Sequence, residues 1–327
     1  MIITRTPFRI SFVGGGSDME AFYSRHDGAV ISTSINKYMY LSSHKFFEPD
    51  QIRLKYSQTE TVSQIQDIQH PIFKTILEKY NIEGGLEFSS IADVPAGTGM
   101  GSSSSFTVGL LHNVRSHLGL ESSKEQLAAE ACEIEIERLK EPIGKQDQYA
   151  AAYGGLNIFR FKSNGSVEVE PVNPGPVKLK CLESNLMMFY TGLQRSASGI
   201  LAEQKKNISA DDKFENLKSM TFLVNDLKEC LLNGELNDFG KILHENWILK
   251  QKLAGSISSG YIDEMYNIAL QNGALGGKLL GAGGGGFLLF YCPKENQDKL
   301  KEALKPLRYF PFQFEEDGSK VVYLGHE

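Results

Sequence analysis

The 327-residue sequence has few cysteines, no long apolar run and no surplus of basic residues, and each absence excludes a class of protein. The cysteines, Cys132, Cys181, Cys230 and Cys292, are more than forty residues apart, so no CxxC pair for zinc or redox chemistry exists. Buried thiols in a reducing compartment are expected. No run approaches the roughly 18 apolar residues that span a bilayer, and residues 1–16 lack the pattern of a secretory signal peptide. We therefore expect a cytoplasmic protein without a membrane partner.

The charge balance argues against a polyanionic partner. The 34 basic and 40 acidic residues give a net charge of −6. Such a chain lacks the basic footprint of a non-specific nucleic-acid binder, so no nucleic-acid partner is expected. Hydrophobic residues are 41% and charged residues 23%, as in ordinary globular proteins. At roughly 150 residues per domain, the length suggests about two domains.

Hydrophobic periodicity divides the chain into two halves. The first forty residues read as extended segments, and apolar residues from Phe106 to Leu118 recur at helical spacing. Ser123 is a plausible N-cap for the next helix. The proline-rich residues 171–180 are the best linker candidate. Most of residues 197–271 have a helical pattern, with interruptions near residues 234 and 256. Further strands are predicted at residues 156–161, 287–291 and 321–324, and a helix at 297–307.

Glycine is bunched, and the most informative cluster is DVPAGTGMGSSSS, residues 93–105, directly before a predicted helix. Gly97, Gly99 and Gly101 let successive backbone N–H groups point one way, and the helix start adds unpaired N–H groups. Together they predict an anion site suited to a triphosphate. A serine hydroxyl there can also reach Mg²⁺. The segment is not a Walker A loop, because GxxxxGK[ST] is absent. The plainer interpretation is a Gly/Ser turn capped by serine.

Two other segments contain residue patterns that are associated with cofactor binding or catalysis. GAGGGG, residues 281–286, satisfies GxGxxG, but a dinucleotide fingerprint needs a helix after it and a strand is predicted there. A nicotinamide oxidoreductase is therefore disfavoured. In ERLKEPIGKQDQ, residues 137–148, Asp147 enters an alanine-rich segment. A carboxylate among small apolar residues is poorly solvated and needs a partner.

Together these segments resemble the three motifs of the GHMP kinase family. They are TPFRISFVGGGSD (residues 6–18), the loop at 95–105, and KLLGAGGGGF (278–287). Residues 141–155 and 191–197 are most similar to sugar-1-kinases acting on heptose 7-phosphate, with L-fucokinase domains close by. The resemblance implies a two-domain α+β fold. Residues 1–175 would form an N-terminal α/β ATP-binding domain, and residues 176–327 a C-terminal ferredoxin-like α/β sandwich.

The implied chemistry is transfer of the ATP γ-phosphate to the anomeric hydroxyl of a small-molecule sugar phosphate, D-glycero-D-manno-heptose 7-phosphate, with Mg²⁺ as cofactor. By resemblance, Asp147 would accept the hydroxyl proton or orient the attacking oxygen. Arg9 would stabilise that oxygen or the passing phosphoryl group. Ser103 would bind Mg²⁺, with Glu137 as the second ligand and Glu135 as its rival.

The other implied contacts form two sets. The ATP phosphates would be bound by Pro95, Gly97, Thr98, Gly99, Met100, Gly101, Ser102, Ser103 and Ser104. The substrate would be bound by Gly16, Ser17, Asp18, Arg195, Gly283 and Gly284. The alternatives are an L-fucokinase or another sugar-1-kinase and, in a different class, a non-catalytic sugar sensor on the same fold. The adenine contacts are not identified, and a homodimer is left open.

Overall fold

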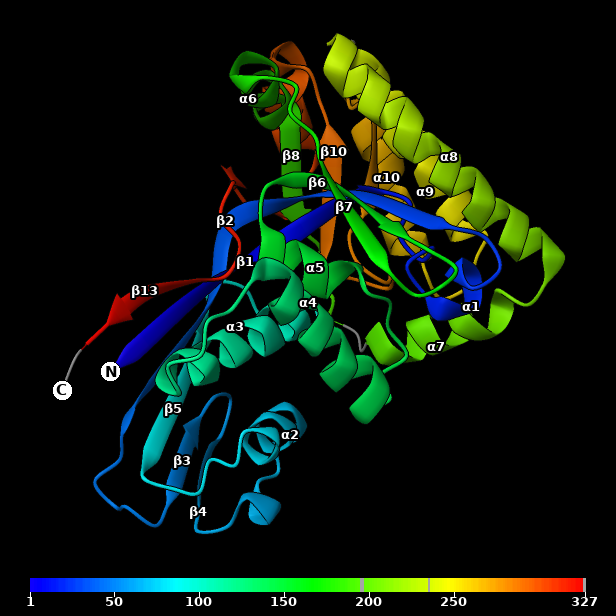
Figure 1. Ribbon diagram of the computed structural model, residues 1–327. Coiled ribbons are helices and arrows are strands. Elements are labelled where there is room, and N and C mark those ends of the chain that lie inside the picture. The colour runs from blue at the N-terminus through cyan, green and yellow to red at the C-terminus, as the bar shows by residue number, and fades with distance from the viewer. Residues whose placement is uncertain (195–196, 235, 326–327) are drawn as a thin grey trace.

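The computed structural model describes residues 1–194, 197–234 and 236–325, and their strands form two sheets (Figure 1). The larger, nine-stranded sheet has the order β13-β1-β2-β5-β3-β4, with β6, β7 and β12 joined through β2. Its strands are β1 (Ile2–Val13), β2 (Gly28–Lys45), β3 (Ile52–Lys55), β4 (Thr59–Val62), β5 (Leu86–Ala92), β6 (Leu156–Phe161), β7 (Val167–Pro171), β12 (Phe314–Glu315) and β13 (Lys320–Leu324). The long strand β2 pairs with β6 through its first half and with β5 through its second half.

The helices of this first unit lie on the large sheet or pack against one another. They are α1 (Glu20–Tyr23), η1 (Ile65–Asp67), α2 (Pro71–Lys79), α3 (Ser102–His117), α4 (Lys124–Cys132), the π-helical turn η2 (Glu133–Arg138) and α5 (Gln146–Tyr153). The helix predicted from Phe106 is confirmed as α3, which lies on β1 and β2. Ser123 is indeed the N-cap of α4, where Ser123 and Gln126 form a reciprocal capping box that satisfies two helix-end N–H groups.

The second unit is a four-stranded antiparallel sheet with helices, and its connectivity is ferredoxin-like. The order β11-β8-β10-β9, with β-α-β-β-α-β along the chain, confirms the expected architecture. Its strands are β8 (Leu186–Tyr190), β9 (Gly276–Leu279), β10 (Phe287–Tyr291) and β11 (Arg308–Tyr309). The helices are α6 (Pro176–Asn185), α7 (Ala197–Asn207), α8 (Asp211–Asn233), α9 (Leu236–Gln251), α10 (Gly260–Gln271), η3 (Lys294–Asn296) and α11 (Gln297–Ala303).

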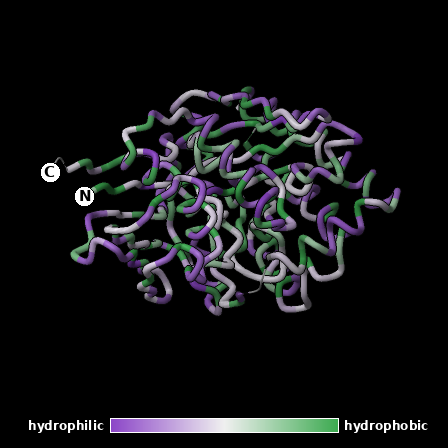
Figure 2. The backbone as a smooth tube through the Cα atoms, turned by 60° about the horizontal axis from the view of Figure 1, so that its bottom comes forward, coloured by the Kyte–Doolittle hydropathy of each residue, from purple (hydrophilic) through white to green (hydrophobic). Residues whose placement is uncertain are grey.

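The end of the chain returns to the first sheet, which corrects the predicted extent of the second unit. Strand β13 pairs with β1, so that Ile2 lies opposite Leu324, and β12 pairs with β2. Figures 1 and 2 show the first and last strands side by side. Residues 172–175 connect β7 to α6, and residues 314–324 belong to the sheet of residues 1–171. The linker expected at 171–180 is in part the first turn of α6, which Pro176 begins.

Apolar residues fill the interior of both units (Figure 2). One core cluster is shared between them, since Ile31 and Phe159 of the first unit belong with Leu223 and Leu289 of the second. All four cysteines are free thiols, and three are buried, whereas Cys181 is exposed, contrary to expectation. Among the described residues, no helix has the length and apolar character needed to cross a membrane.

Candidate active site

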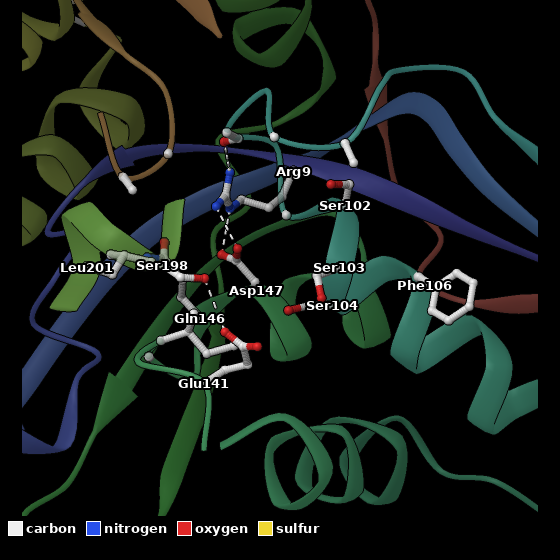
Figure 3. A pocket seen from close by; sticks show the side chains of 18 of the residues that line it. Arg9, Ser102, Ser103, Ser104, Phe106, Glu141, Gln146, Asp147, Ser198 and Leu201 are labelled. Atoms are coloured by element: carbon white, nitrogen blue, oxygen red, sulfur yellow. Dashed lines mark hydrogen bonds and ion pairs between the residues drawn. The ribbon is translucent and has the colours of Figure 1, made fainter. Parts of the chain in front are cut away.

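A cavity of about 890 Å³ lies at the junction of the two units. Its walls come from the turn after β1, the loop between β5 and α3, the start of α5, helices α7 and α9, and the loop after β9. Figure 3 shows the centre of this cavity, with Asp147 between the serines that begin α3 on one side and Glu141, Gln146 and Ser198 on the other. Segments far apart in sequence therefore build one site.

The glycine-rich loop forms one wall of the cavity. Of the nine residues predicted to contact phosphate, seven line the cavity: Pro95, Gly97, Gly99, Gly101, Ser102, Ser103 and Ser104. The other two residues do not line the cavity. Met100 is buried in the protein, and the Thr98 hydroxyl donates to the carbonyl of Pro95. Gly101 is the left-handed N-cap of α3, so the unpaired N–H groups of the first helical turn open at the cavity. This arrangement favours a bound anion.

Arg9 and Asp147 meet at the centre of the cavity. Arg9 Nε donates to Asp147 Oδ1 and Arg9 Nη2 to Oδ2, both at 2.8 Å, while Nη1 donates to the Gly99 carbonyl at 2.6 Å. The Arg9 side chain is 5% exposed and that of Asp147 is 24% exposed. The guanidinium thus fixes the carboxylate beside the phosphate loop, and two parallel charge-assisted bonds fix its orientation.

Asp18 is the second carboxylate of the cavity. Its Oδ1 accepts hydrogen bonds from Gly16 N at 2.9 Å and Gln146 Nε2 at 3.2 Å, and its Oδ2 accepts from Gln146 N at 3.2 Å. Burial raises the pKa of Asp18, and the nearby charge of Asp147 raises it further. Gly16 and Asp18, which the sequence predicts to bind substrate, line the cavity. Ser17 does not face it, because its buried hydroxyl lies 2.8 Å from the Gly14 carbonyl and 3.0 Å from the Ala29 carbonyl and accepts a hydrogen bond from Ala29 N at 3.1 Å.

Glu135, rather than Glu137, reaches the phosphate loop. Both carboxylate oxygens of the fully buried Glu135 accept hydrogen bonds, from Ser103 Oγ at 2.6 Å, Ser104 Oγ at 2.8 Å and Gln148 Nε2 at 2.7 Å. Burial raises the pKa of Glu135, and these three bonds oppose the shift. Glu137 lies on the exposed side of η2, which corrects its predicted position beside Ser103. The π-helical turn carries Glu135 inward, and such turns are frequent at functional sites.

The third glycine cluster closes the cavity from the second unit. Gly281 abuts the phosphate loop so closely that a Cβ there would lie 2.3 Å from Gly99 Cα. Gly281 and Ala282 line the cavity. Gly283 and Gly284, which were predicted to bind substrate, pack instead against Ile257, to whose carbonyl Gly284 N donates at 2.9 Å. Strand β10 follows this cluster, which agrees with the sequence argument against a dinucleotide fingerprint.

The far end of the cavity beyond the serines is largely apolar and was missed by the sequence analysis. Tyr56, His70, Ile72, Val94 and Phe106 line this end. His70 caps α2, since its Nδ1 accepts from Phe73 N at 3.4 Å, and burial lowers its pKa. Tyr56 follows β3, Val94 follows β5, and the others come from the start of α2 and from α3. They share no local motif, so periodicity alone could not reveal them.

Several polar groups at the opposite end were also missed, namely Glu141, Gln146, Ser198, Gln204 and Lys250. Ser198 Oγ donates to Glu141 Oε2 at 3.2 Å. The buried amide nitrogen of Gln204 and the amide oxygen of Gln146 have no hydrogen-bond partner among the described residues. Unpaired buried amides at a cavity wall are suited to a polar ligand. Arg195, predicted to bind substrate, lies outside the described residues.

An anion-binding helix start, an oriented carboxylate and a polar pocket opposite them define a phosphotransferase that acts on a small polar acceptor. The comparisons with known proteins agree. Residues 68–155 match the model of the GHMP kinases N terminal domain, and residues 227–308 that of the GHMP kinases C terminal. The chain belongs to the GHMP kinase family, whose members use ATP, and is a sugar kinase.

The similar proteins include several sugar kinases. A D-glycero-alpha-D-manno-heptose 7-phosphate kinase from Campylobacter jejuni is 31% identical, with 98% of each chain covered. A bifunctional fucokinase/GDP-fucose pyrophosphorylase from Arabidopsis thaliana is 26% identical over 92% of this chain and 30% of its own length. The crystal structure of a D-glycero-D-manno-heptose 1-phosphate kinase from Bacteroides thetaiotaomicron superimposes with a TM-score of 0.82 at 25% identity, over the full length of both chains.

Proposed function

We propose that this sugar kinase phosphorylates the anomeric hydroxyl of D-glycero-D-manno-heptose 7-phosphate and so supplies nucleotide-activated heptose for surface glycan synthesis. The observation that carries the proposal is the similarity to the heptose 7-phosphate kinase of Campylobacter jejuni along 98% of both chains. That similarity spans both walls of the cavity, donor side and acceptor side. The product is the 1,7-bisphosphate, which a phosphatase-class and a nucleotidyl-transfer reaction would have to process further.

ATP fits the half of the cavity between the apolar end and the phosphate loop. The rings of Tyr56, His70 and Phe106 offer flat apolar surfaces for a purine. The triphosphate then follows the loop to the N-terminus of α3, where the Ser102 hydroxyl and the unpaired N–H groups of the first helical turn donate to its oxygens. The γ-phosphate ends beside Arg9 and Asp147, on the side where the acceptor enters.

The residues behind the loop fit Mg²⁺. Ser103 supplies a hydroxyl oxygen that lines the cavity, and Glu135 lies directly behind it with hard carboxylate oxygens. The described residues contain no cluster of three or more acidic, histidine or cysteine side chains that could hold a metal. The remaining ligands would therefore be phosphate oxygens and water, as is usual for Mg²⁺. Bound there, the ion would neutralise charge on the β- and γ-phosphates.

Asp147 and Asp18 have different roles in the phosphoryl transfer. The anomeric oxygen attacks the γ-phosphorus, a bond forms between them, and the bond from phosphorus to the β–γ bridging oxygen breaks as ADP leaves. The hydroxyl proton passes to Asp147. Each oxygen of this carboxylate accepts one hydrogen bond from Arg9 and retains a further lone pair that can accept the proton. Asp18, held by Gly16 and Gln146, binds sugar hydroxyls and orients the ring.

A screen of phosphorylated and free sugars with ATP tests the proposal. ADP release identifies the acceptor, and phosphorus NMR identifies the hydroxyl that becomes phosphorylated. We expect D-glycero-D-manno-heptose 7-phosphate to have the highest kcat/KM and to give a 1-phosphate. The similarity to the fucokinase domain favours free L-fucose as the second candidate. A higher kcat/KM with L-fucose than with the heptose phosphate would overturn the proposed substrate, but the assignment as a sugar kinase would stand.

A further inference from the structure

Lys250 is a buried cation in the wall of the cavity, and the mechanism above does not use it. It lies in the last turn of α9 and is 5% exposed. Its ammonium donates to the carbonyl of Gly281. In the described part of the chain this is its one recorded hydrogen bond, and no carboxylate lies within ion-pair distance. An ammonium carries three donors, so two remain for a group inside the cavity.

The charges around Lys250 belong to the centre of the site. Burial and then the charge of Arg9 lower the pKa of Lys250, Asp18 and Asp147 oppose the shift, and the resulting pKa is about 8. Lys250 therefore interacts with the groups on both the donor and the acceptor side. The charge of Arg9 is balanced by Asp147, to which it is joined by two parallel hydrogen bonds. Lys250 thus supplies positive charge that no carboxylate of the site neutralises directly.

A second buried lysine shows what a purely structural ammonium looks like here. Lys278 of β9 is fully buried and donates to the carbonyls of Ser11 at 2.8 Å and Phe12 at 3.0 Å, joining the two units. It lies behind the cavity wall, whereas Lys250 is part of that wall. Burying an ammonium is costly unless other groups compensate it. For Lys250, an anion in the cavity would provide that compensation.

The two cations hold the two loops that meet at the centre. Arg9 binds the carbonyl of Gly99, Lys250 binds the carbonyl of Gly281, and these two glycines are in contact. The phosphate loop and the acceptor-side loop thus meet between a guanidinium from the first unit and an ammonium from the second. In the kinase proposed above, the phosphoryl group would pass from ATP to the sugar beside this contact.

We propose that Lys250 is a catalytic residue whose ammonium contacts a non-bridging oxygen of the phosphoryl group while it passes from ATP to the sugar. The proposal rests on the sugar kinase function proposed above. Lys250 keeps its protons throughout, since the hydroxyl proton goes to Asp147 and ADP leaves with the electrons of the broken P–O bond. Charge on the passing group spreads over its oxygens, so a fixed cation there stabilises the transition state more than the ground state.

Lys250→Met tests this role, because methionine keeps much of the length and loses the charge. Lys252→Met is the matched control, since Lys252 is exposed just past the end of the same helix. We expect Lys250→Met to lower kcat by ~10²–10³-fold, with KM for ATP and sugar changed by only a few fold. The control should match the wild type. Near-normal kcat in Lys250→Met overturns the proposal. So does a rise in KM confined to phosphorylated sugars, which would place Lys250 on the acceptor's own phosphate.

Binding measurements provide a second readout that needs no turnover. Lys250→Met should bind ADP like the wild type and bind ADP with fluoroaluminate, a mimic of the passing phosphoryl group, at least tenfold more weakly. Equal affinity of both proteins for the mimic overturns the proposal. Absence of turnover in the wild type with every sugar would instead overturn the proposed function, and the mimic would still test Lys250. The melting temperature of Lys250→Met should be no lower than that of the wild type, because an apolar side chain replaces a buried charge.

The pH profile gives an independent check with Lys250→Arg. The charged groups that face Lys250 are Arg9 from β1, Asp18 from the turn after β1, Asp147 from α5 and the buried Lys278 from β9. Since the pKa of Lys250 in the unliganded protein is about 8, wild-type kcat/KM, which reports groups of the free enzyme, should fall above that pH. Lys250→Arg stays charged there and should lose this basic limb, whatever its absolute rate. An unchanged basic limb in Lys250→Arg overturns the proposal.

Discussion

Arg9 and Asp147 face each other through two parallel hydrogen bonds of 2.8 Å, although 138 residues separate them in the chain. The pair joins β1 to the first turn of α5, and the third Arg9 contact ties both to the phosphate loop at Gly99. A carboxylate held on both oxygens cannot rotate away from the acceptor. The orientation of Asp147 is therefore set before substrate arrives, which is an important part of catalysis by positioning.

Asp147→Asn should lower kcat by ~10²–10⁴-fold, because the amide cannot accept the hydroxyl proton. The change also turns an amide N–H₂ toward Arg9, so one arm of the fork is lost. ADP affinity, measured by calorimetry, should remain within a few fold of the wild type. A variant with near-normal kcat would remove Asp147 from proton transfer.

Glu135→Gln and Glu137→Gln form a matched pair of variants on the same helical turn. Glu135 contacts Ser103 and Ser104, so its neutralisation should raise the Mg²⁺ concentration needed for half-maximal turnover by about 10–100-fold. Glu137 is exposed and its variant should behave like the wild type. The test is a Mg²⁺ titration at saturating ATP. A larger effect of Glu137→Gln would reverse the assignment made from the structure.

Gly281→Ala should separate the two loops that meet at the cavity. The new Cβ would lie 2.3 Å from Gly99 Cα, and φ at Gly281 is +73°, where side chains are strained. We expect a loss of about 1–3 kcal/mol in the free energy of unfolding and a marked fall in kcat. Gly255→Ala is the control, since a Cβ there meets nothing within 4 Å. Both are measured by urea unfolding and steady-state kinetics, and equal behaviour of the two variants would contradict the close contact.

The pKa of Asp18 predicts a pH-dependent stability difference between the wild type and Asp18→Asn. Burial, and then Asp147, raises this pKa above 3.8, so the folded protein binds the proton more tightly than the unfolded chain. The folded state is therefore penalised as pH rises and Asp18 ionises. Relative to Asp18→Asn, the wild type should lose stability from about pH 4 upward, as urea midpoints at several pH values would reveal. A difference independent of pH would mean that Asp18 is well solvated.

Local signals explain which features the sequence could predict. The loop ending in four serines predicted an anion site before a helix because glycine spacing and helix starts are short-range properties, and α3 begins there. The helical period of α4 also indicates which glutamate of the following turn is buried. Leu127, Ala131 and Glu135 are spaced by four residues and share a helix face that is buried, which favours Glu135 over Glu137.

Other features depend on pairings that a single sequence does not encode locally. The last strand was predicted near residues 321–324, but its pairing with β1 spans more than 300 residues of chain. Tyr56, His70 and Phe106 meet at the apolar end of the cavity only after β3, α2 and α3 have packed. In the sequence, Lys250 has the position of an ordinary surface lysine on an amphipathic helix. Its burial and its contact with Gly281 arise only because α9 packs against the loop after β9.

The path of the chain has a mechanical consequence. The chain leaves the large sheet once, after β7, and returns once, before β12, so the second unit is inserted within the first rather than appended to it. An appended unit swings on one tether, whereas an inserted unit is held by two and cannot swing away without straining both. The two connections, together with the core shared by the units, thereby restrict how far Gly99 and Gly281 can move apart. Cutting either tether should let the two halves of the cavity drift apart while each sheet keeps most of its own hydrogen bonds.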